Sequence, residues 1–161
     1  MATYYFDTSA TVKRYVTEPG TAEIDEVLDA LSRGRPQHTV AFVSVGIMEV
    51  VAAFSRLERT GAISALQWNG LATQFNTDLS SRYLALEVTK SVVQEASALT
   101  RRRGLRGYDA VHLASALTLR QSLRESDLDA PIFVSADADL CAAARDEGLQ
   151  VMAPGLPTAL P

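Results

Sequence analysis

The stretch TYYFDTS, residues 3–9, decides the fold. Its first four residues favour β-structure, and an apolar run without alternation is typical of a strand buried on both faces of a sheet. Asp7 ends this strand, and Thr8 or Ser9 is placed to cap the helix that begins at Ala10. Ligands of open α/β sheets bind at the carboxyl ends of central strands, so we expect Asp7 at the mouth of a crevice. An aspartate that only caps a helix is the common alternative.

Length and composition indicate an ordinary globular protein. The chain has 161 residues, of which 47% are hydrophobic and 21% charged, and this predicts one domain with a proper core. No apolar stretch is long enough to span a bilayer and the N-terminus lacks a secretory pattern, so we expect a cytoplasmic protein with no membrane contact. The single Cys141 cannot form an internal disulfide, which fits a reducing compartment.

The net charge and the numbers of His and Cys residues limit the possible ligands of the protein. The net charge of −4 argues against a non-specific nucleic-acid coat, although four arginines crowd into residues 101–106, just before Asp109. Two His and one Cys cannot build the usual zinc site. Oxygen ligands would have to hold any metal ion, and this makes Mg²⁺ or Mn²⁺ the candidate.

Strands and helices alternate along the chain. This order predicts parallel strand pairing with helices on both faces, and hence a three-layer α/β/α domain whose mostly parallel central sheet has four to five strands. We place the domain at residues 1–153 and a proline-rich tail at 154–161. The predicted strands cover residues 3–6, 39–43, 83–86 and 131–134, with an edge strand at 149–152. Five of the predicted helices cover residues 21–32, 45–59 (capped by Ser44), 89–103, 108–124 and the segment from Asp137 to Arg145. Two more start at Ala10 and at the capping box of residues 64–67.

Four carboxylates stand at equivalent places in this layout. Asp7 and Asp137 follow strands, Asp109 begins a helix, and Glu49 lies about one turn into another. Each has an ordinary alternative: a helix cap for the aspartates, and a side chain at the margin of the apolar face for Glu49. Together they would meet at one sheet edge, where mutual repulsion raises carboxylate pKa values unless a cation intervenes. A divalent ion resolves that conflict, and such a site activates water and binds phosphate oxygens.

Several residues near these acids remain open to two interpretations. Arg106 and, less strongly, Arg103 are candidates for phosphate contacts, but cations also stabilise a helix C-terminus. His112 could act as a general acid, although a hydrogen-bonded structural histidine is the commoner case. Trp68 and Phe75 fit either the core or an interface with a partner.

Four motifs, in order, resemble the PIN-domain ribonucleases, and most closely the VapC-like toxins of prokaryotic type II toxin–antitoxin pairs. Their order and spacing span nearly the whole chain, and the family often has Thr at the position of Ser135. The proline-rich tail is not part of the family pattern. The matching stretches are FDTSA (6–10) with KRY (13–15), SVGIME (44–49), RGYDAVHLA (106–114), and VSADADL (134–140) with ARDEGL (144–149).

This resemblance implies a PIN-like fold and Mg²⁺- or Mn²⁺-dependent endonucleolytic cleavage of RNA, leaving 5′-phosphate and 3′-hydroxyl ends. It also implies a separately encoded antitoxin and homodimerisation. The implied acidic site consists of Asp7 and Asp109 as principal metal ligands, Asp137 and Glu49 completing the shell, Asp139 as a weaker auxiliary, and Ser9 and Ser135 orienting carboxylates.

Other functions fit the same pattern less well. A house-keeping PIN nuclease of RNA processing without an antitoxin, or a catalytically inactive PIN-fold binding module, would share these residues. A phosphoacceptor receiver domain needs a lysine on a late strand, and the chain has only Lys13 and Lys90. A phosphatase with an aspartyl nucleophile needs a second Asp where Ser9 stands.

Overall fold

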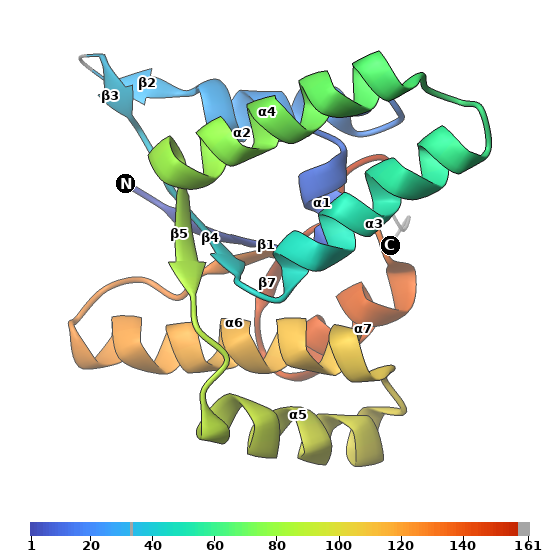
Figure 1. Ribbon diagram of the computed structural model, residues 1–161. Helices are drawn as coiled ribbons and strands as arrows, with labels where there is room; N and C mark the ends of the chain where they lie inside the picture. Colours follow the sequence, from blue (N-terminus) through green and yellow to red (C-terminus); the bar gives the residue numbers. More distant parts are fainter. Residues whose placement is uncertain (33, 158–161) are drawn as a thin grey trace.

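A parallel β-sheet forms the middle layer of the protein (Figure 1). The computed structural model describes residues 1–32 and 34–157. The sheet has five strands in the order β5-β4-β1-β6-β7, and every neighbouring pair is parallel. β1 is therefore the central strand, as its apolar sequence predicts. The strands are β1 (Thr3–Phe6), β4 (Thr39–Val43), β5 (Tyr83–Leu86), β6 (Ile132–Val134) and β7 (Gln150–Met152).

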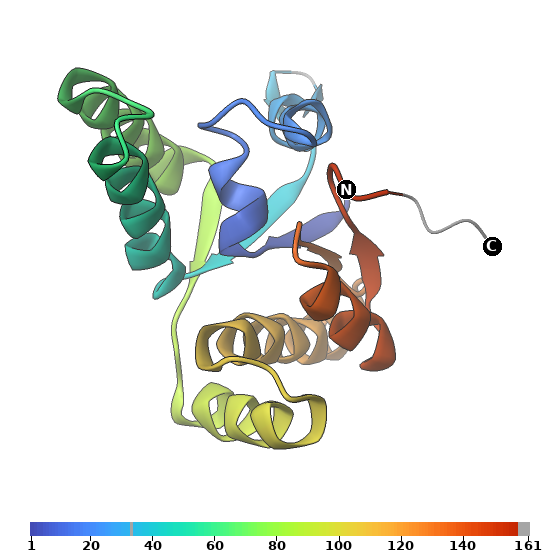
Figure 2. The same ribbon diagram turned by 90° about the vertical axis from the view of Figure 1, so that its right-hand side faces the viewer.

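Helices cover both faces of this sheet (Figures 1 and 2). Successive side chains of a strand point to opposite faces, so Tyr5 packs into the core beneath α5–α7 and Phe6 into the core beneath α1–α4. Within the described ranges, no helix combines the length and apolar character needed to cross a bilayer. One layer holds α1 (Thr8–Val12), α2 (Thr21–Asp29), α3 (Gly46–Arg59) and α4 (Ala65–Ser81), and the other holds α5 (Lys90–Arg103), α6 (Gly107–Glu125) and α7 (Ala138–Asp146).

The prediction of a helix over residues 21–32 is wrong at its C-terminal end. α2 ends at Asp29, and the chain then forms an antiparallel hairpin of β2 (Leu31–Ser32) and β3 (Arg35–Pro36). Leu31, which the helical pattern assigns to the core, is 59% exposed. Ala30 adopts an extended conformation, and its carbonyl accepts the N–H of Gln37 at 2.8 Å. The hairpin thus reverses the chain just before it enters β4.

Two helix starts also differ from the prediction. Asp7 itself is the N-cap of α1, accepting the Ala10 N–H at 2.8 Å, whereas Thr8 and Ser9 lie inside the helix. α3 begins without a side-chain cap, so Ser44 does not have the predicted role. The predicted capping box at residues 64–67 is confirmed at the start of α4.

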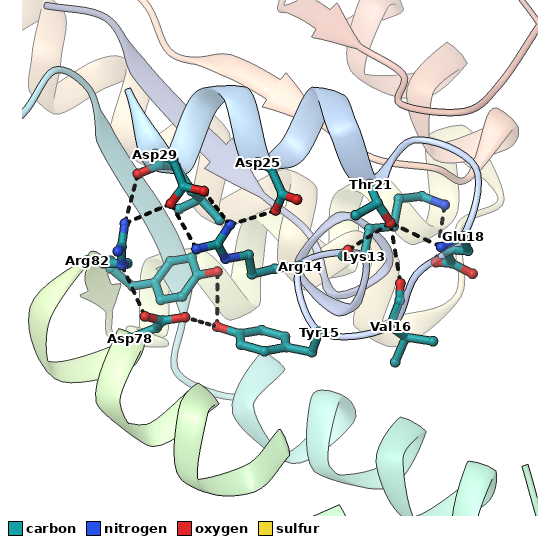
Figure 3. Close-up of polar contacts among 12 residues, drawn as sticks. Lys13, Arg14, Tyr15, Val16, Glu18, Thr21, Asp25, Asp29, Asp78 and Arg82 are labelled. Carbon is teal, nitrogen blue, oxygen red and sulfur yellow. Dashed lines mark hydrogen bonds and ion pairs between the residues drawn. The ribbon is translucent and has the colours of Figure 1, made fainter. Parts of the chain in front are cut away.

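An ion-pair network ties the outer helices to the segment after α1 (Figure 3). Arg14 pairs with Asp25 at 2.6 Å and with Asp29 at 2.8 Å, both on α2. Arg82 bridges the same Asp29 to Asp78 of α4, which accepts the Tyr15 hydroxyl at 3.0 Å. The side chains that immediately follow α1 therefore clamp α2 and α4 on one face of the sheet.

The start of the tail packs closely against the turn before α2. Pro154 is buried, and a Cβ atom added at Gly155 would lie 2.3 Å from the Pro19 carbonyl oxygen. Gly155 also has a φ of +72°, which favours glycine. The sequence also predicts no regular structure for residues 158–161, but these lie outside the described residues.

We expect Gly155→Ala to destabilise the protein by roughly 2–4 kcal/mol, because it adds a backbone clash to the cost of a positive φ. Gly61→Ala is the matched control: Gly61 has a φ of +74° but no atom within 4 Å of its added Cβ. That variant should lose only about 1–2 kcal/mol. Urea unfolding of both variants measures the difference, and equal losses would contradict the close contact.

Candidate active site

Four carboxylates from separate parts of the chain line one cavity of about 580 Å³. Asp7 follows β1, and Asp137 follows β6 as the N-cap of α7. Glu49 and Asp109 lie in the first turns of α3 and α6. The carboxyl ends of parallel strands meet at one sheet edge, which is why residues 130 positions apart in sequence share this cavity.

Asp7 is the most buried of these acids, with 3% of its surface exposed. Ser135 Oγ donates to its Oδ2 at 2.6 Å, and Ser9 Oγ lies 2.8 and 2.9 Å from its two oxygens. The serine oxygens in turn accept the N–H groups of Ala136 and Asp137. Both serines therefore fix the Asp7 carboxylate relative to the β6–α7 junction.

Burial has the largest effect on the Asp7 carboxylate and raises its pKa, although His112 and the hydrogen bonds from Ser135, Ala10 and Ser9 act in the opposite direction. Asp7, the N-cap of α1, therefore lies in an environment that disfavours its ionised form. The Asp7 side chain can therefore cap α1 and also belong to the acidic site.

Glu49 is held by side chains from two other elements. Thr8 Oγ1 donates to Glu49 Oε2 at 2.8 Å, and His112 Nε2 lies 2.8 Å from the same oxygen. His112 is 2% exposed, and its Nδ1 lies 3.1 Å from the Tyr5 hydroxyl. Because a carboxylate only accepts, the Nε2–H of His112 donates to Glu49. His112 is therefore the hydrogen-bonded structural histidine that the sequence favours.

The net shift of the Glu49 pKa is downward. Burial raises it, but the hydrogen bonds from His112 and Thr8, together with the His112 charge, outweigh burial. Gly46 permits this arrangement, since a Cβ there would lie 2.5 Å from the Phe42 ring and 3.1 Å from His112 Cε1. The first turn of α3 can therefore approach α6 closely.

Asp109 and Asp137 complete the group. Burial, followed by the negative charge of Asp137, raises the pKa of Asp109, and Asp7 and Glu49 raise it further. Among the described residues, none of these four acids forms an ion pair with Lys or Arg, and the His112–Glu49 contact is their only potential salt bridge. The carboxylates repel one another without a neutralising cation.

The donors in this cavity suit a hard divalent cation. In the part of the chain that the structure describes, no three His, Cys, Asp or Glu side chains are grouped tightly enough to hold a metal ion as they stand. Mg²⁺ does not require such a cage, because it keeps several waters and is bound through one or two carboxylates together with substrate phosphates. The negative charges around Asp109 and the all-oxygen donor set therefore fit Mg²⁺ or Mn²⁺.

Two of the predicted site residues lie elsewhere. Asp139 is exposed and lines a separate recess together with Arg103. Arg103 pairs with Asp146 at 3.0 Å and with Glu147 at 2.7 Å. Arg106, in contrast, lines the acidic cavity.

Sequence reasoning missed two cations of the cavity, Lys13 and Arg56. Lys13 is 7% exposed, and its ammonium group donates to the Pro19 carbonyl at 2.7 Å and pairs with Glu18 at 3.1 Å. Helical spacing was the available signal, since Lys13 follows Ser9 by four residues and Arg56 follows Glu49 by seven.

Comparison with known proteins agrees with this geometry. The sequence matches the PIN domain family over residues 4–146, and the chain belongs to that family. Ribonuclease VapC45 of Mycobacterium tuberculosis is 31% identical over 119 residues, which cover 74% of this chain and 78% of that protein. Within the PIN family, the chain therefore belongs with the VapC ribonucleases, which confirms the resemblance seen in the motifs.

Two solved structures share the fold at lower sequence identity. PAE2754 from Pyrobaculum aerophilum superposes with a TM-score of 0.60 at 21% identity, covering 93% of this chain and 89% of that chain. VapBC2 from Rickettsia felis, bound to a DNA fragment from its promoter, gives a TM-score of 0.59 at 15% identity over 94% of this chain and 98% of that chain. These likenesses confirm the α/β PIN fold.

We expect Asp7→Asn to stabilise the protein at neutral pH in EDTA. The raised pKa of Asp7 means that the native state keeps a proton at pH values where the unfolded chain has lost it. At pH values above the native pKa, the buried Asp7 charge therefore lowers the free energy of unfolding. The advantage of the Asn variant should therefore shrink as the pH falls toward about 4, the ordinary Asp value. Thermal unfolding measures it, at roughly 2–4 °C per kcal/mol.

The exposed Asp129 supplies a matched control for this experiment. Asp129→Asn should leave the midpoint of unfolding unchanged at both pH values. An Asp7→Asn protein that is less stable than wild type at every pH would contradict the account of a carboxylate disfavoured by burial.

Proposed function

We propose that this protein is a Mg²⁺- or Mn²⁺-dependent endoribonuclease and the toxin of a toxin–antitoxin pair. The observation that carries the proposal is the convergence of Asp7, Glu49, Asp109 and Asp137 on one cavity without a Lys or Arg partner among the described residues. Membership of the VapC ribonucleases supports RNA as the substrate.

In this proposal Asp7 and Asp109 hold the metal ion, and Asp137 and Glu49 complete its shell directly or through water. Ser9 and Ser135 keep the Asp7 carboxylate in one orientation. The metal supplies Lewis-acid stabilisation of charge on the phosphoryl oxygens when it is bound.

Glu49 presents one free carboxylate oxygen in this scheme. Thr8 and His112 both bind Oε2, so Oε1 has no hydrogen-bond partner among the described residues. A deprotonated Glu49, favoured by its lowered pKa, can accept a hydrogen bond from the attacking water through Oε1. In-line attack of that water on phosphorus forms the new P–O bond and breaks the P–O3′ bond, and the 3′ oxygen takes up a proton from solvent, which leaves a 5′-phosphate and a 3′-hydroxyl.

The wall of the cavity supplies a cation for the substrate. Arg106, the N-cap residue of α6, is exposed and has no ion-pair partner among the described residues. Its guanidinium group suits bidentate contact with a phosphate beside the acids. Arg103 is left out of this role because Asp146 and Glu147 already neutralise it.

The proposed antitoxin is a separate protein, and its binding segment carries a cation into the same cavity. Such a side chain would neutralise the clustered acids in place of the metal ion. Homodimerisation remains a prediction from the family. Co-expression with the product of the adjacent gene should relieve growth arrest caused by this protein, and persistent arrest would contradict that pairing.

Asp7→Asn should abolish Mg²⁺-dependent cleavage, with a loss of at least about 100-fold, because it removes a principal charge that holds the ion. Sequencing of RNA ends after induction of wild type and variant measures the effect in the protein's own RNA pool. Asp129→Asn is the control and should cleave as wild type does. Equal cleavage by the Asp7→Asn protein in a preparation free of other nucleases would refute the assignment.

A further inference from the structure

A second recess opens beside the acidic cavity and shares part of its lining. Its volume is about 370 Å³, and it shares four lining residues with the cavity that holds the acids. The recess is lined by Thr8, Glu49, Ala52, Ala53, Arg56 and Arg59, and all but the first of these belong to α3.

The lining follows one stripe of the α3 helix. Positions 49, 52, 53, 56 and 59 recur at helical spacing and lie on one face. The two alanines are small and leave a trough between the Glu49 carboxylate and the arginines. From Glu49, Arg56 is displaced by roughly 10 Å along the helix axis and Arg59 by roughly 15 Å. Arg56 therefore lies on the wall that the recess shares with the acidic cavity, and Arg59 lies farther out along α3.

The two arginines are exposed. Arg14, Arg82, Arg102 and Arg103 all form ion pairs, whereas in the described ranges no acid pairs with Arg56 or Arg59. Positive charges in the last turn of α3 also interact favourably with the helix dipole, which is one reason for arginines at these positions. The dipole does not account for a recess that shares Glu49 and Arg56 with the acidic cavity.

We propose that Arg56 and Arg59 bind backbone phosphates of the RNA that flanks the scissile bond, so that the strand runs along α3 out of the acidic cavity. This inference rests on the proposed function. None of the described residues that line the recess is aromatic, so it offers no surface for base stacking. The contact therefore positions RNA through its phosphates and does not read its sequence.

Fluorescence anisotropy of a labelled, mixed-sequence single-stranded RNA 20-mer tests the proposal. The titrations are made in EDTA at several salt concentrations, so that binding is measured without cleavage. The Arg56→Gln/Arg59→Gln protein should bind about tenfold more weakly, and the slope of log K against log salt should be shallower by about 1.4, or about 0.7 for each lost phosphate contact. Arg59→Gln alone should give about half the slope change.

Arg124→Gln is the charge-matched control, because Arg124 is exposed near the opposite end of α6 from Asp109. Its binding curve and slope should equal those of wild type. Unchanged binding by the double variant, or equal weakening by the control, would overturn the inference. Arginine-dependent binding of a labelled polyglutamate peptide without any such dependence for RNA would also overturn it, in favour of an acidic protein segment.

Cleavage separates this inference from the function on which it rests. Wild-type protein that does not cleave RNA with Mg²⁺ or Mn²⁺ would count against the proposed function. If the wild type cleaves RNA and the Arg56→Gln/Arg59→Gln protein keeps the wild-type KM and salt slope, the result would count against the α3 contact alone. The inference expects KM to rise more than kcat falls, because both arginines are displaced along α3 from Glu49 and contact the flanking strand.

Discussion

Repulsion between carboxylates brought to one sheet edge is the constraint on which this structure depends. β1 delivers Asp7 into the interior, where burial raises its pKa, and the N-terminal turns of α3 and α6 add Glu49 and Asp109. A protein selected for stability alone would neutralise such a cluster with arginine. Here no described Lys or Arg forms an ion pair with these acids, so the unfavourable charge is retained at the site proposed for a cation.

The remainder of the fold holds these acids in place. Hydroxyl groups of Ser9 in α1 and of Ser135 after β6 fix Asp7, and the Tyr5–His112 pair directs a proton toward Glu49. The Arg14 network secures α2 and α4 behind α1, where the cavity wall begins. Apart from His112, each support is an uncharged hydroxyl or a pair already neutralised, so those supports do not cancel the charge at the site.

The sequence predicted the layers and the acids because both follow from local patterns. Buried strands have unbroken apolar runs, and an acid after a parallel strand reaches the common edge, as Asp7 and Asp137 do. The hairpin at Leu31 was missed because a helical apolar spacing continued past the true end of α2. The separation of Arg103 from Arg106 depends on tertiary contacts to α7, which local patterns do not report.

Calorimetric titration of Mn²⁺ into metal-free wild-type and Asp109→Asn proteins tests the central claim most directly, because it measures the cation without relying on any RNA. The account predicts a saturable Mn²⁺ site in the wild type that Mg²⁺ displaces, and an affinity more than about tenfold lower in the variant. Absence of binding to the wild type, or identical isotherms for the two proteins, would contradict it.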